Sequence, residues 1–579
     1  MRKYFLITVF IGICNSFLYS QKLETYFEKS NFLRTPRYDS TVIYAKSLTQ
    51  QASFIVYQSI GKSHEGRDIP LLIAAKGKEF TPEQAKKSGK NIVLIQACIH
   101  AGEPDGKDAG LMLFRDFILK PECNKLLENN IVLFIPILNV DGHERFSAYN
   151  RINQNGPIEM GWRTNAQNLN LNRDYLKAQS PEIKAWLNLF YTWEPDFFID
   201  CHVTDGADYQ YPITYMMETF GSMNDSITHW QKDMFLPSLT QQMQKAGFPI
   251  IGYITFRKWT DFESGLEAGI TPPMLSHGLT SLVDCPGLLI ESHMLKDYKT
   301  RVFGTYEMLK NTLLLLSSQK NTFNRIRKYS LQSLIIPNKY TVAYRTSTSD
   351  SVMLDFLGYK YTVEKSDLTG GKWFKYSKIP KTYQLPLFNK PVPDKTVNVP
   401  NYYVVPIGWA DVFIPLLHLH RIKYFTLKSD SMISVSFYRF TDVKLSPVSY
   451  ESCQRVVSFS IDTFSMKTPF LKGSLLIPLN QPHYKILIHL IEPESPASLF
   501  SFGYFNSIFE QKEYGESYVL EVLAREMLKN PDIKKQYEQA IEKNPTMKNN
   551  TWEILNWFYQ HSAYADPCLN VYPIGKILK

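Results

Sequence analysis

Four side chains that can bind a metal ion or move a proton stand at the ends of apolar runs in this sequence. One run of strand-like composition stops at His100, and the carboxylate of Glu103 follows three residues later. A second apolar run stops at His202, and a third stops at Glu291. Two histidines and one carboxylate make a zinc site that keeps one coordination position open for water, and a second glutamate beside it can act as a general base.

A single His-x-x-Glu sequence is weak evidence for a metal site, because it occurs by chance in many proteins. The repetition is stronger evidence, since all three apolar runs end on a residue that can bind metal or act as a base. Ligands of open α/β sheets gather at the carboxyl ends of the strands. We therefore expect the four side chains to occupy loop positions at one edge of a sheet.

Apolar strands alternate with helical patterns over the first half of the chain. Strand-like and helical segments follow one another at 92–99, 107–119, 131–138, 180–192, 197–201, 226–246, 287–290 and 299–317. Continuous apolar strands between helices are typical of a sheet that is covered on both faces. The prediction is an α/β fold with a mainly parallel mixed sheet and helices on both faces.

The pattern changes near residue 325. Short alternating segments rich in Tyr, Val, Ser and Thr follow, and 516–545 is helical and highly charged. The proline-rich stretch 378–400 is typical of an extended connector. A chain of 579 residues is long enough for two or three domains. We expect the α/β domain at 21–325 and a β-rich accessory domain with a helical C-terminal segment at 326–579.

The composition argues against several classes of protein. Hydrophobic residues make up 44% of the chain and charged residues 21%, which is typical of a globular protein. The net charge is +9 without a long block of like charges, so we expect no nucleic-acid partner. The seven cysteines are scattered and include no Cys-x-x-Cys pair, so no disulfide framework can be read from the sequence.

The N-terminus has the pattern of a secretory signal peptide. Arg2 and Lys3 precede an apolar segment that ends at Cys14, and small residues then favour cleavage after Ser20, which would remove 1–20. The apolar segment is too short to be a permanent membrane anchor. Lipoprotein processing at Cys14 is disfavoured because a bulky isoleucine precedes it. We expect a secreted or periplasmic protein.

Six pieces of the sequence together resemble the zinc metallocarboxypeptidases, the carboxypeptidase A-like family. In chain order they are His100-Ala-Gly-Glu103, Asn139-Val-Asp-Gly142, Trp162-Arg163, Asn170-Leu-Asn172-Arg173, His202 and Glu291. The order and the character of all six match, which is far more specific than one His-x-x-Glu. The resemblance covers roughly residues 40–320, and the remainder resembles the C-terminal extensions of large bacterial secreted members.

The resemblance implies a zinc-dependent hydrolase that acts on peptide bonds. One zinc ion per chain would be held by His100, Glu103 and His202. Glu291 would be the general base, and Arg163 would polarise the scissile carbonyl and stabilise the oxyanion.

The resemblance also implies how the substrate is held. Asn172 and Arg173 would bind the free C-terminal carboxylate of a peptide. Asn170 stands where relatives often carry an aspartate that orients the first histidine, and a neutral amide makes that ligand less basic. The mobile tyrosine of the family is expected shortly before the base, but 265–284 contains no tyrosine.

The sequence therefore predicts a secreted zinc metallocarboxypeptidase that hydrolyses the C-terminal peptide bond of peptides. One alternative is a zinc amidase or deacylase that acts on cell-wall peptides or acyl-amino acids with the same groups. A second alternative is a catalytically inactive binding protein on the same fold. The intact set of ligands, base and arginines favours the first reading.

Overall fold

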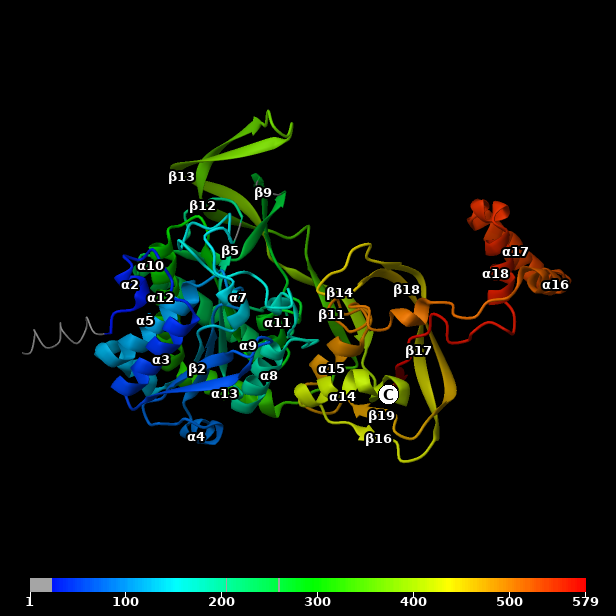
Figure 1. Cartoon of the computed structure of the whole chain (residues 1–579), viewed down its shortest axis with the longest axis horizontal. Coiled ribbons are helices and arrows are strands. Elements are labelled where there is room, and N and C mark those ends of the chain that lie inside the picture. Colours follow the sequence, from blue (N-terminus) through cyan, green and yellow to red (C-terminus); the bar gives the residue numbers. More distant parts are fainter. Residues whose placement is uncertain (1–22, 205, 259–260, 579) are drawn as a thin grey trace, which may run out of the picture. The chain divides into compact units, whose positions relative to one another are not determined.

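A computed structural model describes residues 23–204, 206–258 and 261–578 (Figure 1). The expected signal peptide at 1–20 lies outside the described residues. The chain divides into two compact units. The first extends to Val399 and also includes Val412–Tyr424 and Pro478–Ser498, whereas the second comprises Pro400–Asp411, Phe425–Ile477 and the residues from Leu499 onward.

The first unit is built on a mixed sheet with the strand order β1-β2-β4-β3-β5-β10-β6-β7. The strands are β1 (Ile55–Lys62), β2 (Asp68–Ala74), β3 (Asn91–Gln96), β4 (Asn130–Ile135), β5 (Phe197–Thr204), β6 (Ile213–Met216), β7 (Ile250–Gly252) and β10 (Gly287–His293). The central strands β4, β3, β5 and β10 are parallel, whereas β1, β2 and β6 join antiparallel. Strands β3, β4 and β5 are buried along their whole length, which is why the sequence shows them as unbroken apolar runs.

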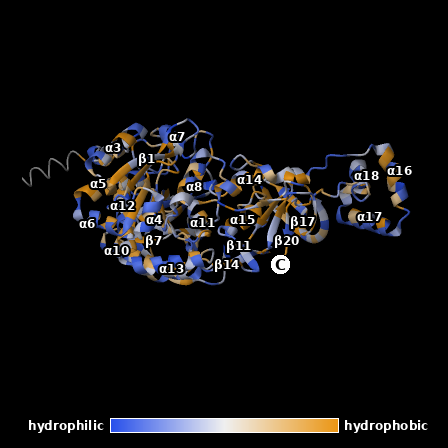
Figure 2. Cartoon of the chain, turned by 90° about the horizontal axis from the view of Figure 1, so that it is seen from below, coloured by the Kyte–Doolittle hydropathy of each residue, from blue (hydrophilic) through white to orange (hydrophobic). Residues whose placement is uncertain are grey.

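Helices pack against this sheet, and apolar residues concentrate in the sheet region (Figure 2). The long helices of the unit are α3 (Tyr38–Gln51), α5 (Asp105–Leu119), α8 (Pro181–Trp193), α12 (Tyr298–Ser318) and α13 (Lys320–Gln332). Helix α8 begins where predicted because the Ser180 side chain accepts a hydrogen bond from the Ile183 amide and Pro181 follows at the first helical position. The predicted α/β fold class is confirmed.

Residues 339–398 fold as part of the first unit. Strand β11 (Lys339–Thr346) pairs with β14 (Pro391–Asn398), and β12 (Val352–Lys365) and β13 (Lys372–Phe388) form a long hairpin (Figure 1). The stretch 378–400 is thus mainly strand, and the expected connector is wrong. Strand β13 tolerates proline because, among the residues that the structure describes, its second edge pairs with β9 at Leu387 and Phe388 alone.

The hairpin also joins the first unit through a shared core. Leu387 and Phe388 pair with β9 (Asp261–Ala268), which itself pairs with β8 (Ile254–Lys258). Phe356 and Tyr383 of the hairpin pack with Phe262 of β9 and with Tyr209, in the loop that follows β5. The first unit therefore extends beyond the expected boundary at residue 325. It does so because β13, after that residue, pairs with β9, before it.

A chain that ends at residue 325 is expected to be insoluble or rapidly proteolysed. It would lose the hairpin side chains that bury Phe262 and Tyr209, and each exposed aromatic side chain costs roughly 1.5–3 kcal/mol. The measurement compares soluble yield and limited proteolysis of residues 21–325 and 21–579. A truncated chain with unchanged yield and protease resistance would support independent folding up to residue 325.

The second unit contains a sheet with the strand order β16-β19-β15-β20-β17-β18. The strands are β15 (Tyr402–Val405), β16 (Phe425–Thr426), β17 (Ser431–Leu445), β18 (Val456–Phe470), β19 (Leu475–Pro478) and β20 (Gly575–Ile577). Helices α16 (Ser517–Met527), α17 (Pro531–Lys543) and α18 (Thr551–Gln560) form the predicted helical segment and have an apolar cluster of their own. Among the described residues, no helix is both long and apolar enough to cross a membrane.

Candidate metal and catalytic site

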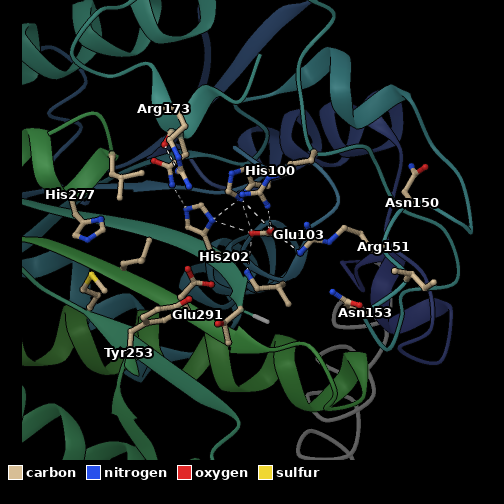
Figure 3. A pocket seen from close by; sticks show the side chains of 18 residues that line it. His100, Glu103, Asn150, Arg151, Asn153, Arg173, His202, Tyr253, His277 and Glu291 are labelled. Atoms are coloured by element: carbon tan, nitrogen blue, oxygen red, sulfur yellow. Dashed lines mark hydrogen bonds and ion pairs between the residues drawn. The ribbon is translucent and has the colours of Figure 1, made fainter. Parts of the chain in front are cut away.

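The three predicted metal ligands come together from two parts of the chain (Figure 3). His100 and Glu103 lie in the loop between β3 and α5, and His202 lies in β5. The two histidine Nδ1 atoms are 3.2 Å apart, and Glu103 Oε2 is 3.3 Å from Nδ1 of His100 and 3.1 Å from Nδ1 of His202. All three side chains are buried, and they form the one group of three metal-binding side chains found in the described parts of the chain.

The arrangement of these atoms fits a zinc ion. A tetrahedral zinc with bonds of about 2.0–2.1 Å places its ligand atoms roughly 3.3–3.4 Å from one another, close to the observed separations. His100 Nε2 lies 3.0 Å from Asn170 Oδ1, and His202 Nε2 lies 3.0 Å from Asp200 Oδ2. If each ring is neutral and donates from Nε2 to one of these oxygens, its Nδ1 turns a lone pair toward the other ring. Two lone pairs and a carboxylate in such contact favour a cation between them.

The electrostatics of His100 and Glu103 suit metal binding near neutral pH, whereas His202 tends to hold a proton. Burial lowers the pKa of His100 to about 4, so this ring is neutral at pH 7, the form that binds a metal. Burial opposes ionisation of Glu103, but His100 and Arg151 hold its pKa well below the usual value. Burial also opposes the charge on His202, but Asp200 raises its pKa well above the usual value. A proton therefore competes with the metal for His202.

Glu291 reaches the same cavity from the neighbouring strand. Its Cα is the register partner of the His202 Cα in the parallel pair β5–β10. Side chains of paired residues on adjacent strands point to the same face, and the carboxylate lies on the His202 side of the cavity (Figure 3). Both strands continue for two residues beyond this pair. His202 and Glu291 are thus in strands rather than at the expected loop positions, because the buried residues that follow them also pair.

The cavity has a volume of about 510 Å³, and its lining includes the predicted polar residues except Asn170. The Arg163 side chain is 40% exposed, and its NH1 lies 3.6 Å from Glu103 Oε1. Asn172 accepts a hydrogen bond from the Ser276 amide through Oδ1 and has Nδ2 directed toward His202 Nε2 at 3.5 Å. Asn170 Oδ1 also accepts the Asn172 amide, which fixes the orientation of its side chain. The structure therefore brings all predicted site residues together.

Arg173 lies in the short helix Leu171–Arg173 that follows Asn170. Its guanidinium donates from NH1 to the Asn172 carbonyl at 2.7 Å, which holds the guanidinium in place. In Figure 3 it stands above His202, on the opposite side of the ligands from Arg151. The cavity thus has one arginine at each end.

Asp200, Tyr253 and Arg151 are among the lining or supporting residues that the sequence did not predict. Asp200 orients His202. Its position in the sequence could have indicated this, because residues two apart in a strand share a face. Tyr253 lines the cavity but lies well before 265–284, the interval in which the family's tyrosine is expected. Arg151 forms an ion pair with Glu103 from a distant polar loop, and no local pattern marks it.

Comparisons with known proteins bear on the family of this chain. Residues 42–246 match a family model described as zinc carboxypeptidase, which confirms the predicted family resemblance for this segment. No match was found among curated proteins.

Similar solved structures include three carboxypeptidases. A metallo-carboxypeptidase from Burkholderia cenocepacia is 19% identical with a TM-score of 0.36, over 49% of this chain and 70% of that one. A metallo-carboxypeptidase from Pseudomonas aeruginosa, in complex with (2-guanidinoethylmercapto)succinic acid, is 17% identical with a TM-score of 0.36, over 49% of this chain and 68% of that one. Carboxypeptidase A from Helicoverpa armigera is 16% identical with a TM-score of 0.36, over 49% of this chain and 74% of that one.

Proposed function

We propose that this protein is an exported zinc metallocarboxypeptidase that removes the C-terminal residue of peptides. The observation that carries the proposal is the convergence of two histidines and a glutamate at tetrahedral spacing, with a second glutamate and three arginines on the same cavity. The export of the protein is proposed from the signal-like N-terminus alone.

The chemistry of the proposed reaction can be assigned to particular groups. A bound zinc supplies a Lewis acid and lowers the pKa of its water to about 7. Glu291 would accept the proton of the attacking water on its carboxylate and pass it to the nitrogen of the leaving amine. Arg163 would stabilise the negative charge that develops on the scissile carbonyl oxygen, because a guanidinium stays protonated at any relevant pH.

Arg173 and Asn172 would confine the enzyme to the C-terminal end of a peptide. A planar guanidinium suits a carboxylate through two parallel hydrogen bonds. Asn172 Nδ2 can donate to the same carboxylate, because the shorter contact of His202 Nε2 is with Asp200 and not with Asn172. An amidase or deacylase would use the same metal site without the need for this carboxylate anchor.

The wild-type enzyme is expected to cleave a free-acid peptide much faster than the same peptide with a C-terminal amide. A charge-assisted contact contributes on the order of 1.5–3 kcal/mol, so Arg173→Ala should lower kcat/KM for the free acid by about tenfold to a hundredfold. The measurement is kcat/KM of both proteins on both peptides. The mutant should lose most of the preference.

The amide peptide is the matched control, since it keeps every other contact. Equal cleavage of the two peptides by the wild type would support the amidase reading. A wild type that holds zinc but cleaves neither peptide would support the binding-protein reading.

A further inference from the structure

Arg151 is the nearest cation to the metal ligand Glu103. Its NH2 lies 2.9 Å from Glu103 Oε1, whereas Arg163 NH1 lies 3.6 Å from the same oxygen. The Arg151 side chain is 17% exposed, against 40% for Arg163. Arg151 is therefore the direct partner of this oxygen, and Arg163 is left available for the substrate.

The Glu103 carboxylate is held from both of its oxygens. Oε2 accepts a hydrogen bond from the Val203 amide at 3.0 Å, and Oε1 receives Arg151. Oε1 is also 3.2 Å from His100 Nδ1, so a rotation of the carboxylate would change its distance to the other ligands. A carboxylate whose two oxygens both have a fixed partner keeps one orientation toward the metal position.

Arg151 is itself held in place by Gln154 of the same loop, which contacts the segment His100-Ala-Gly-Glu103. Its Nε donates to Gln154 Oε1 at 3.2 Å, and Gln154 Nε2 donates to the Gly102 carbonyl at 3.0 Å. A Cβ at residue 102 would lie 2.9 Å from Arg151 Cγ and 2.8 Å from the Gly161 carbonyl oxygen. Only glycine at 102 lets the arginine stem approach this closely, so the two positions fit one another.

The place of Arg151 in the cavity separates its role from that of the substrate anchor. Figure 3 shows it on the far side of Glu103 from Arg173, and the dashed contact ends on Glu103. We propose that Arg151 is a positioning residue of the metal centre, which holds Glu103 in the orientation that binds zinc. The proposal rests on the zinc site of the proposed function but not on the cleavage of peptides.

The test compares the full-length wild type with Arg151→Met, Arg151→Lys and Arg163→Ala. Methionine keeps most of the stem that packs over Gly102 and removes the charge, and lysine restores the charge. Zinc affinity is measured by competition with a chelator, and the visible spectrum of the cobalt(II)-substituted protein reports the ligand arrangement. Thermal unfolding of the metal-free proteins checks that each variant is folded.

Arg151→Met is expected to bind zinc about 10–100-fold more weakly and to show an altered cobalt spectrum. Arg151→Lys should recover part of both, and Arg163→Ala should keep the wild-type affinity although it lies near the same oxygen. Arg151→Met should also lower kcat with little change in KM, because Arg151 acts through Glu103.

Wild-type affinity and an unchanged spectrum in Arg151→Met would overturn the proposal. An equal loss of zinc in Arg163→Ala would also overturn it, since general charge and not position would then matter. A wild type that binds neither zinc nor cobalt would overturn the metal centre itself. A wild type that binds both but cleaves no peptide would overturn only the proposed function.

Discussion

Glu291→Gln is expected to abolish peptide hydrolysis while zinc stays bound. The carboxamide has nearly the same shape as the carboxylate, and Glu291 is not one of the three converging ligands, so the cavity and its metal should be retained. The amide cannot accept the proton of the attacking water. General base catalysis contributes about 10²–10⁴-fold, so kcat should fall by at least this factor.

The measurement pairs kcat on a free-acid peptide with the zinc content of the purified variant. The substrate KM should change little, because the groups proposed to hold the peptide are untouched. A variant with near-normal kcat and full zinc would place the base elsewhere in the cavity. A variant that has lost its zinc would instead make Glu291 a ligand.

His202→Ala is expected to remove the metal without unfolding the domain. His202 supplies one of the three ligand atoms, and two ligands are too few for a stable protein zinc site. The backbone of β5 pairs with β3 and β10 independently of this side chain. The loss of the ring removes the histidine partner of the buried Asp200, which keeps its hydrogen bond from the Ser276 hydroxyl, and costs about 1–3 kcal/mol.

The experiment measures zinc per chain after dialysis and the far-ultraviolet circular dichroism of the variant. His277→Ala is the matched control, because His277 is a buried histidine that lines the same cavity and donates to or accepts from Thr271 instead of joining the ligand group. The control should keep about one zinc per chain. Full zinc occupancy in His202→Ala would show that the ligand set is different.

The central strands and the ligand group could be predicted because both leave local patterns in the sequence. A strand that is covered on both faces is apolar throughout, and His202 and Glu291 interrupt such runs near their ends. Asp200 was missed although it lies two residues before His202 on the same face of the strand. In the sequence, Asp200 looks like an ordinary polar residue within an apolar strand.

The remaining differences come from contacts that connect distant parts of the chain. Arg151 reaches Glu103 from a polar loop, and nothing in the local sequence marks that approach. The boundary expected at residue 325 fails to follow the packing because β13 pairs with β9 across it. Helix α15 (Tyr484–Ile491) falls where short strands were expected, since a short apolar run gives no period that separates a buried helix from a strand.

The register of β5 and β10 has a consequence for how this protein could be redesigned. The spacing between the backbones of the proposed metal ligand His202 and the proposed base Glu291 is set by hydrogen bonds between adjacent strands, about 4.8 Å apart, and not by any loop. The loops around the cavity can therefore be lengthened, shortened or exchanged to alter peptide selectivity while the reacting groups keep their separation. Directed evolution that leaves these two strands intact should change which peptides are accepted much more readily than it changes the chemistry.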